Sequence, residues 1–207
     1  MGSDHYFSSS PRSDFTTRTI RVRLAGRDLD VVTAGGVFSP EHLDDGTRIL
    51  LESVPAPPAT GHLLDLGAGW GPIALSLALQ SPDATVWAVD VNERALELVR
   101  RNAERHGITN VNPVLPDDVP ADVRFAAIWS NPPIRVGKQE LHAMLAKWLP
   151  RLEADAAAWL VVAKHLGAES LQRWLGDDLG LEVERAANSK GFRVLAARHA
   201  PAGSATG

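Results

Sequence analysis

The chain has 207 residues, of which 44% are hydrophobic and 22% charged, a composition that suits one soluble α/β domain with a substantial core. The absence of cysteine excludes disulfides, thiolate metal sites and cysteine nucleophiles, and we expect no metal site. The formal net charge of −4 excludes binding of nucleic acid through overall positive charge, so such a partner needs a local basic patch.

Residues 1–18 are polar and are expected to be disordered. They contain no apolar signal segment, and no later run is long enough to span a bilayer, so we expect a cytoplasmic protein. "TIRVRLAGRDLDVVTA" alternates apolar and polar residues on either side of a turn, which predicts a hairpin. Ser39 and Pro40 then predict the N-cap and first residue of a helix. Hairpin and helix occupy residues 19–56, and the linker "PAPPATG" follows.

Strand and helix patterns alternate from residue 60 to residue 199. Five runs have the pattern of a strand: "LLDL", "TVWAV", "VNPVL", "RFAAIWS" and "AAWLVVAKH". Two more such runs flank Lys190 and Gly191. Helix patterns follow Gly71 and Asn92 and cover residues 138–154 and 168–178. This order predicts a Rossmann-like, doubly wound, mostly parallel seven-stranded sheet with an antiparallel edge strand. Residues 19–199 are expected to form one domain with its catalytic core at 60–199, and residues 200–207 a disordered tail.

A glycine-rich loop, "DLGAGWG", stands between the first strand and the first helix of this core. Gly67, Gly69 and Gly71 allow the backbone to approach a ligand, and the helix N-terminus offers free N–H groups. Asp90 ends the next strand, 25 positions after Asp65, where a carboxylate can accept both hydroxyls of a ribose. Together these features predict a nucleoside cofactor. A dinucleotide is disfavoured because Gly71 follows Gly69 by two positions instead of three.

The loop resembles the first motif of class I S-adenosylmethionine-dependent methyltransferases, an acidic residue followed by G-x-G-x-G. The resemblance implies S-adenosylmethionine as the cofactor, because its ammonium and sulfonium groups tolerate Asp65 beside the loop. It also implies that Asp90 binds the ribose and that Asp117, or the adjacent Asp118, lies near the adenine.

The segment "SNPPIRVGK", residues 130–138, follows the fourth strand of the core. Proline has no N–H for the ladder, and a residue before a proline is pushed toward extended geometry, so this segment can neither continue the strand nor coil into a helix. This predicts a stiff loop whose carbonyls have no local donors. It resembles the Asn-Pro-Pro motif of enzymes that methylate a planar amino group. The Asn131 side-chain oxygen and the Pro132 carbonyl are expected to accept the two N–H groups of that amine, with Pro133 holding them rigidly.

Ile134 completes this predicted catalytic motif but departs from its commonest form. Many such enzymes have an aromatic ring at this position that stacks on the acceptor, and isoleucine offers no such stacking. Trp129 and Phe38 are candidates to compensate, and both are also candidates for the hydrophobic core.

The wider sequence resembles small-subunit ribosomal RNA guanine-N2 methyltransferases and their single-domain relatives, through "GVFS", "DDGTRILL", "DLGAGWGPIALSLAL" and "SNPPIRVGK". The resemblance implies guanine N2 as the acceptor, ribosomal RNA or the small ribosomal subunit as the partner, and a position over the cofactor for Phe38. Arg135 and Lys138 are candidates for phosphate contact. The cofactor-binding residues expected from motif and resemblance are Phe38, Asp65, Gly67, Ala68, Gly69, Gly71, Asp90, Val91 and Asp117 or Asp118.

Other functions also fit these motifs. The same chemistry serves adenine in nucleic acid or a glutamine amide in a translation release factor. A non-catalytic RNA-binding module on a methyltransferase scaffold is a further alternative, although an intact Asn131 and intact glycines argue against it. An NAD-dependent oxidoreductase is disfavoured by the glycine spacing.

Overall fold

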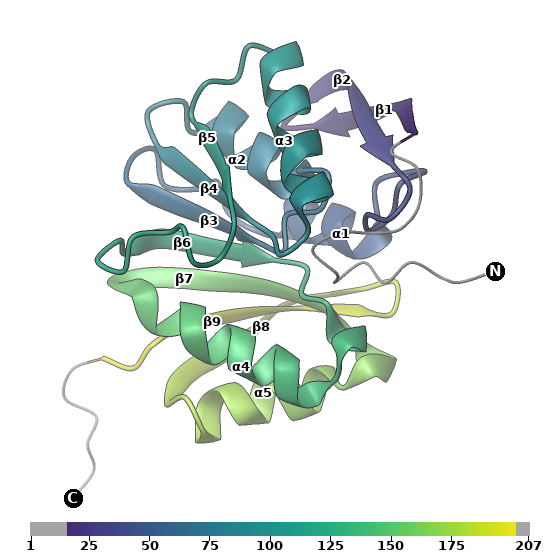
Figure 1. Cartoon of the computed structure of the whole chain (residues 1–207). Helices are drawn as coiled ribbons and strands as arrows, with labels where there is room; N and C mark the ends of the chain where they lie inside the picture. Colours follow the sequence, from purple (N-terminus) through teal and green to yellow (C-terminus); the bar gives the residue numbers. More distant parts are fainter. Residues whose placement is uncertain (1–15, 202–207) are drawn as a thin grey trace, which may run out of the picture.

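The computed structural model of the chain describes residues 16–201, except the side chain of Arg135. At its centre is a seven-stranded sheet with the order β5-β4-β3-β6-β7-β9-β8 (Figure 1). Neighbouring strands are parallel except at β7–β9 and β9–β8. The predicted sheet is therefore confirmed. Its strands are β3 (His62–Leu66), β4 (Thr85–Val89), β5 (Val111–Val114), β6 (Phe125–Ser130), β7 (Leu152–Ala163), β8 (Leu181–Ser189) and β9 (Phe192–His199).

Helices cover both faces of the sheet, because successive strand residues point to opposite sides. Leu63 of β3 packs among residues of α1 (Asp45–Ser53), α2 (Pro72–Gln80) and α3 (Glu93–Arg105). Leu64 packs with residues of α4 (Lys138–Trp148) and α5 (Ala168–Asp177) on the other face (Figure 1). None of the helices within residues 16–201 is long and apolar enough to cross a membrane.

The strand order reverses between β3 and β6: β4 and β5 extend the sheet on one side, and β6 and β7 on the other. In doubly wound sheets, ligands bind outside the carboxyl ends of the strands at such a reversal. The glycine loop follows β3 and the Asn-Pro-Pro loop follows β6, so the two motifs are neighbours at this point. The Ser130 hydroxyl donates to the Leu66 carbonyl over 2.6 Å and ties the two strand ends together.

The predicted hairpin consists of β1 (Thr17–Leu24) and β2 (Arg27–Ala34). Ala25 and Gly26 join the strands with φ of +48° and +76°, the positive pair that a tight hairpin turn requires. β1 begins at Thr17, so the expected disorder up to residue 18 is wrong at its end, because Thr17 and Arg18 pair with β2. Most of the two expected disordered segments, residues 1–15 and 202–207, lies outside the described part of the chain, and residues 16, 200 and 201 are described without helix or strand.

The hairpin is held against the core by α3. The Asn102 side chain accepts from the N–H of Val32 over 2.6 Å and donates to the carbonyl of the same residue over 2.9 Å. It also donates to the carbonyl of Trp70 in the glycine loop over 3.0 Å. Apolar residues of the hairpin and of α2 and α3 share one buried cluster. This packing supports our proposal that hairpin and sheet form one domain.

Helix α1 begins later than the sequence predicts. Ser39 has a φ of +46°, a left-handed conformation that is unsuited to an N-cap. Asp44 is the N-cap instead, and its side chain accepts a hydrogen bond from the N–H of Thr47 over 3.0 Å. Residues 35–44 therefore form a loop that crosses the glycine loop, where the Trp70 indole N–H donates to the Ser39 carbonyl over 3.2 Å.

The fourth helix of the chain is shorter than predicted. α4 ends at Trp148 because Pro150 cannot continue it, and Leu149–Arg151 form a 3-10 turn. β7 consequently begins at Leu152, within the segment predicted to be helical.

The last two strands form a hairpin whose inner member is antiparallel to both of its neighbours. β9 lies between β7 and β8, so the edge strand β8 runs in the same direction as β7. Lys190 and Gly191, with φ of +44° and +83°, form the turn between them.

Candidate active site

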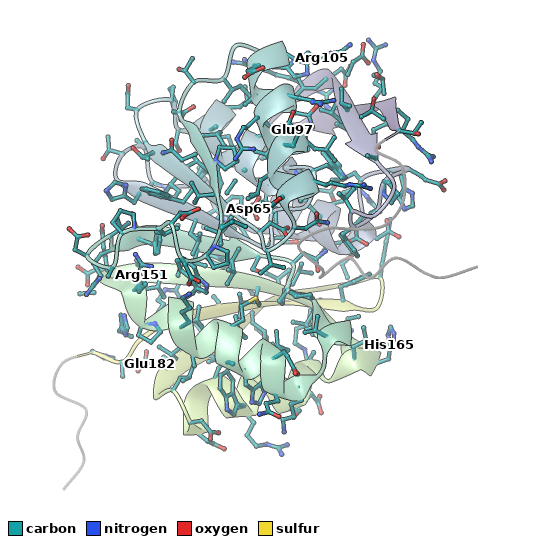
Figure 2. All side chains as sticks on the ribbon, in the orientation of Figure 1. Asp65, Glu97, Arg105, Arg151, His165 and Glu182 are labelled. Atoms are coloured by element: carbon teal, nitrogen blue, oxygen red, sulfur yellow. The ribbon has the colours of Figure 1, made fainter. Side chains whose placement is uncertain are left out.

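A cavity of about 330 Å³ lies at the carboxyl ends of the central strands. Its lining residues follow the strand order: Val91 after β4, Gly67 after β3, Asn131 after β6 and His165 after β7. Figure 2 shows Asp65 near the centre of the molecule and His165 at its rim, beside α5. The cavity therefore runs from the cofactor motif to the Asn-Pro-Pro motif and beyond it.

Two glycines of the loop line this cavity, as predicted. Gly67 and Gly69 have φ of +83° and +56°, values that favour glycine. The N–H of Gly67 donates to the Val89 carbonyl over 2.8 Å, and that of Gly69 donates to the Asp90 carboxylate over 2.8 Å. A side chain at Gly69 would meet no protein atom within 4 Å, so open space lies beside this backbone.

The other two small residues of the loop that were predicted to bind the cofactor, Ala68 and Gly71, do not line the main cavity. Gly71 has a φ of +97°, and a Cβ there would lie 3.1 Å from a methyl group of Val99. Its glycine is therefore required by the close packing of α2 on α3. Ala68 is buried and borders a small adjoining cavity of about 20 Å³.

Asp65 lies behind the loop and not in the cavity, contrary to the sequence prediction. Its Oδ2 accepts from the N–H of Ala74, in the first turn of α2, over 2.8 Å. The N-cap of α2 is Gly71, which has no side chain to cap with, so Asp65 supplies the acceptor from the preceding strand. Its Oδ1 has no hydrogen-bond partner among the described residues.

The pKa of Asp65 is raised from 3.8 to about 8. Burial is the main cause, the hydrogen bond from the Ala74 N–H opposes it, and the nearby Asp90 carboxylate adds a smaller upward effect. Between these pH values the folded chain keeps a proton that the unfolded chain loses. The cofactor-free protein should therefore lose stability as the pH rises from 4 to 8, by about 1 kcal/mol per pH unit. Asp65→Asn keeps an acceptor for Ala74 and cannot ionise, so its free energy of unfolding should depend much less on pH.

Urea unfolding at pH 5, 6, 7 and 8 measures this slope. Asp83→Asn, which removes an exposed carboxylate before β4, is the control and should keep the slope of the unmodified chain. Some slope should remain in Asp65→Asn, because burial also raises the pKa of Asp90. An unchanged slope in Asp65→Asn would contradict the assignment.

Asp90 lines the cavity at the end of β4, where the sequence predicts it. Its Oδ1 accepts from the N–H of Asn92 over 2.9 Å, and its Oδ2 accepts from the N–H of Gly69 over 2.8 Å. Burial raises its pKa, and these backbone donors oppose that effect. The carboxylate is therefore held rigidly, and each oxygen keeps a further lone pair for a ligand hydroxyl. Val91 beside it is 44% exposed and also lines the cavity.

Neither of the two acids expected near an adenine lines the cavity. Asp117 has a side chain 94% exposed and pairs with Lys147 over 2.8 Å, a contact that lowers its pKa. Asp118 is exposed as well. The preceding residue, Pro116, is the one that lines the cavity, because the turn after β5 points the acids outward to solvent and to α4.

The Asn-Pro-Pro segment leaves β6 in a tight turn. Pro133 has φ and ψ of −75° and +75°, and the N–H of Ile134 donates to the Pro132 carbonyl over 2.8 Å. The N–H of Val136 donates to the Pro133 carbonyl over 3.1 Å. The expectation that these carbonyls have no local donors is therefore wrong, because the chain turns at once into the 3-10 helix Ile134–Val136. The Pro132 oxygen keeps a second lone pair for a ligand.

The side-chain amide of Asn131 is fixed in orientation by α1. Its Nδ2 donates to Oδ2 of Asp44 over 2.8 Å and to the hydroxyl of Thr47 over 3.0 Å. A carboxylate can only accept, so the nitrogen must face Asp44. Oδ1 of Asn131 therefore remains as an acceptor in a residue that lines the cavity.

The walls around this acceptor are apolar. Ile134 lines the cavity, as does Phe38, which is 44% exposed. Trp129 is only 2% exposed within the core and cannot stack on a ligand, so only Phe38 of the two candidates reaches the cavity. Phe192, at the start of β9, also lines it and was missed from the sequence. Its position directly after the Lys190–Gly191 turn was the available signal.

The predicted phosphate-binding residues stand at the edge of the site. Lys138 is exposed at the start of α4. The side chain of Arg135 lies outside the described part of the chain. Three of the four arginines of the hairpin are paired with acids: Arg18 with Glu41, Arg21 with Asp30 and Arg23 with Asp28, at 3.0, 3.1 and 3.5 Å.

Residues 28–196 match the family model described as methyltransferase small domain. The chain belongs to this family. The match begins in β2 and ends in β9, so it includes the glycine loop, Asp90 and the Asn-Pro-Pro loop. Membership confirms the resemblance to class I S-adenosylmethionine-dependent methyltransferases and makes the chain an enzyme of that class.

Relatives of this methyltransferase fall into two lengths. This chain is 40% identical to the "Uncharacterized protein YbxB" of Bacillus subtilis over 199 residues, which are 95% of this chain and 98% of that protein. It is 38% identical to "Ribosomal RNA small subunit methyltransferase C" of Aeromonas hydrophila over 145 residues, 67% of this chain and 41% of that protein. The chain thus spans about half the length of the curated ribosomal RNA methyltransferases that it matches.

The solved structures of related proteins agree on the fold. The methyltransferase resembles the "T. Thermophilus 16S rRNA N2 G1207 methyltransferase (RsmC) in complex with AdoMet and Guanosine" with a TM-score of 0.78. The likeness covers 92% of this chain and 52% of that chain, at 22% sequence identity. It shows that the sheet and its helices have the arrangement of a known methyltransferase domain.

Proposed function

We propose that this methyltransferase transfers the methyl group of S-adenosylmethionine to the exocyclic N2 amine of a guanine in small-subunit ribosomal RNA. The observation that carries the proposal is the fixed amide of Asn131, whose Nδ2 is held by Asp44 and Thr47. Asn131 and Pro132 both line the cavity, and we propose that Oδ1 of Asn131 and the Pro132 carbonyl act there as a pair of acceptors. Such a pair suits an amine with two N–H groups.

The lining residues that follow β3, β4 and β5 fit the cofactor. Gly67 and Gly69 present bare backbone to the cavity, and the space beside Gly69 is open. Asp90 has lone pairs for two ribose hydroxyls, and the apolar Val91 and Pro116 suit an adenine ring. When bound, S-adenosylmethionine supplies an electrophilic methyl group on a positively charged sulfur. Asp65 supports this site from behind by holding the first turn of α2.

The residues after β6 and β7 suit the acceptor. The amine conjugated to a guanine ring is a poor nucleophile because its lone pair is delocalised. Asn131 and Pro132 accept its two N–H groups, turn the lone pair toward the methyl group and stabilise the positive charge that develops on nitrogen. Both hydrogens of the amine stay hydrogen-bonded to these two oxygens during methyl transfer, and one of them is afterwards lost to water as a proton. Ile134, Phe38 and Phe192 form the apolar walls around the ring.

The choice of ribosomal RNA rests on the relatives, several of which are named small-subunit ribosomal RNA methyltransferases. Lys138 at the start of α4, together with Arg135 before it, is proposed to contact phosphates of the acceptor RNA. Because the chain spans only about half the length of those relatives, their names support an RNA target for it without fixing which nucleotide is methylated.

Transfer of radiolabelled methyl groups tests the proposal. The acceptors are unmodified small ribosomal subunits, naked ribosomal RNA, duplex DNA and a translation release factor. Label on RNA that digests to N2-methylguanosine, with a binding affinity that falls steeply with salt, is the expected result. Label on DNA or on release factor would keep the amine chemistry and overturn the acceptor. Cofactor binding without any transfer would instead support the non-catalytic scaffold.

A further inference from the structure

Asp44 lies in the cavity with only part of its carboxylate in use. Oδ2 accepts from the N–H of Thr47 over 3.0 Å and from Nδ2 of Asn131 over 2.8 Å. Oδ1 takes part in none of the hydrogen bonds of the described side chains, and none of their cations forms an ion pair with Asp44. Asp44 thus brings to the border of both cavities a half-buried carboxylate with one oxygen that is available to accept from a ligand.

We propose that Oδ1 of Asp44 accepts the ring N1–H of the acceptor guanine and thereby makes the site specific for that base. This inference rests on the proposed function and assigns its specificity to a residue outside the Asn-Pro-Pro motif. Asp44 and Asn131 are joined by a hydrogen bond, so their free oxygens lie in one rigid unit. Guanine presents N1–H directly beside its N2 amine, so it needs a further acceptor whose position is fixed relative to the acceptors of that amine.

The same carboxylate disfavours the other acceptors of this chemistry. Adenine has a lone pair on N1 beside its N6 amine, and a glutamine amide has a carbonyl oxygen beside its nitrogen. Either would place lone pairs against Oδ1 of Asp44, and a carboxylate has no proton to donate. The mismatch leaves polar groups unpaired inside the site, which is the strongest form of discrimination available to hydrogen bonding.

Asp44→Asn separates this role from the structural ones. Asparagine caps helices as well as aspartate does, so α1 should be retained. To accept from Thr47 and from Asn131, the new side chain must turn its oxygen to the Oδ2 position. Its NH₂ group then faces the cavity, where it repels the N1–H of guanine and can donate to an unprotonated ring nitrogen.

The experiment compares guanine with 2-aminopurine, which keeps the exocyclic amine and has no hydrogen on N1. Once the labelled guanine is mapped, the same RNA is made with 2-aminopurine at that one position by splinted ligation. The unmodified enzyme should prefer guanine in kcat/KM by roughly 10- to 100-fold, the usual range for one well-matched base contact. Asp44→Asn should lose about that factor on guanine and show no preference, or prefer 2-aminopurine.

Asp45→Asn is the matched control, because Asp45 is the next carboxylate along the chain, is exposed and pairs with Arg48. It should keep the preference for guanine. Melting temperature and binding of S-adenosylhomocysteine should be unchanged in both variants. If Asp44→Asn keeps the full preference while the unmodified enzyme methylates guanine, the inference is overturned and the proposed function stands. If the unmodified enzyme labels no RNA, both are overturned.

Discussion

Replacing Asn131 with alanine is expected to lower kcat for methyl transfer by about 100- to 1000-fold, the cost of removing one preorganised hydrogen-bonding group from a reacting centre. Alanine removes the Oδ1 acceptor that orients the amine and stabilises its developing charge. Binding of S-adenosylmethionine should change little, because the cofactor motif lies on β3 and β4. Steady-state kinetics on the RNA acceptor and calorimetric titration of the cofactor measure the two quantities.

The matched control for this variant is Asn112→Ala, which removes an exposed asparagine on β5, outside the cavity. It should leave kcat unchanged. An Asn131→Ala enzyme with normal kcat would show that the fixed amide is not part of the reacting centre. A parallel loss of kcat and of cofactor affinity would indicate a collapse of the site instead, since Asn131 also bonds to Asp44 and Thr47.

Asp90→Asn is expected to weaken binding of S-adenosylmethionine by about 10- to 100-fold. The amide cannot accept at both positions, and its NH₂ group must face the N–H of either Asn92 or Gly69, which both donate to the carboxylate. A hydrogen bond between a charged group and a ribose hydroxyl contributes about 1.5–3 kcal/mol, so loss of one gives an effect of this size. Calorimetric titration with S-adenosylmethionine measures it directly.

Asp83→Asn is also the control for Asp90→Asn, because it removes one negative charge from the loop before β4, at a residue that does not line the cavity. Its cofactor affinity should equal that of the unmodified chain. The kcat of Asp90→Asn at saturating cofactor should remain close to normal, since Asp90 is not among the residues assigned to the acceptor. Equal affinity in Asp90→Asn and the unmodified chain would remove Asp90 from the cofactor site.

Features that depend on neighbouring residues were predicted correctly from the sequence. A helix was expected to follow Asn92, and the Asn92 side chain caps α3 by accepting from the N–H of Arg94 over 3.0 Å. A helix was also expected after Gly71, where Pro72 begins α2, and the glycines after β3 have the positive φ that their role requires. Capping, proline geometry and glycine conformations are set within a few residues, so the sequence carries their full signal.

The sequence predictions were wrong where two possible helix starts lie close together, and where the direction of a side chain after a strand depends on the turn that follows. Ser39-Pro40 and Asp44 are both acceptable starts for α1 by sequence, and in the structure Asp44 is the N-cap and is also bonded to Asn131. Asp117 follows β5 at the expected position, yet the turn there exposes it to Lys147. Asp65 precedes the glycine loop as the motif requires, yet its side chain accepts a hydrogen bond from the first turn of α2 and does not line the cavity.

The fold class, the family and the two motifs that follow β3 and β6 are all readable in the amino-acid sequence, because strand and helix periodicity and backbone-restricting residues act over short distances. The set of side chains that meet around Asn131 is not readable there. Asp44 and Asn131 are 87 positions apart, and Phe192 arrives from the far end of the chain. Contacts of this kind depend on how helices and strands pack against one another, and no short stretch of sequence encodes that packing.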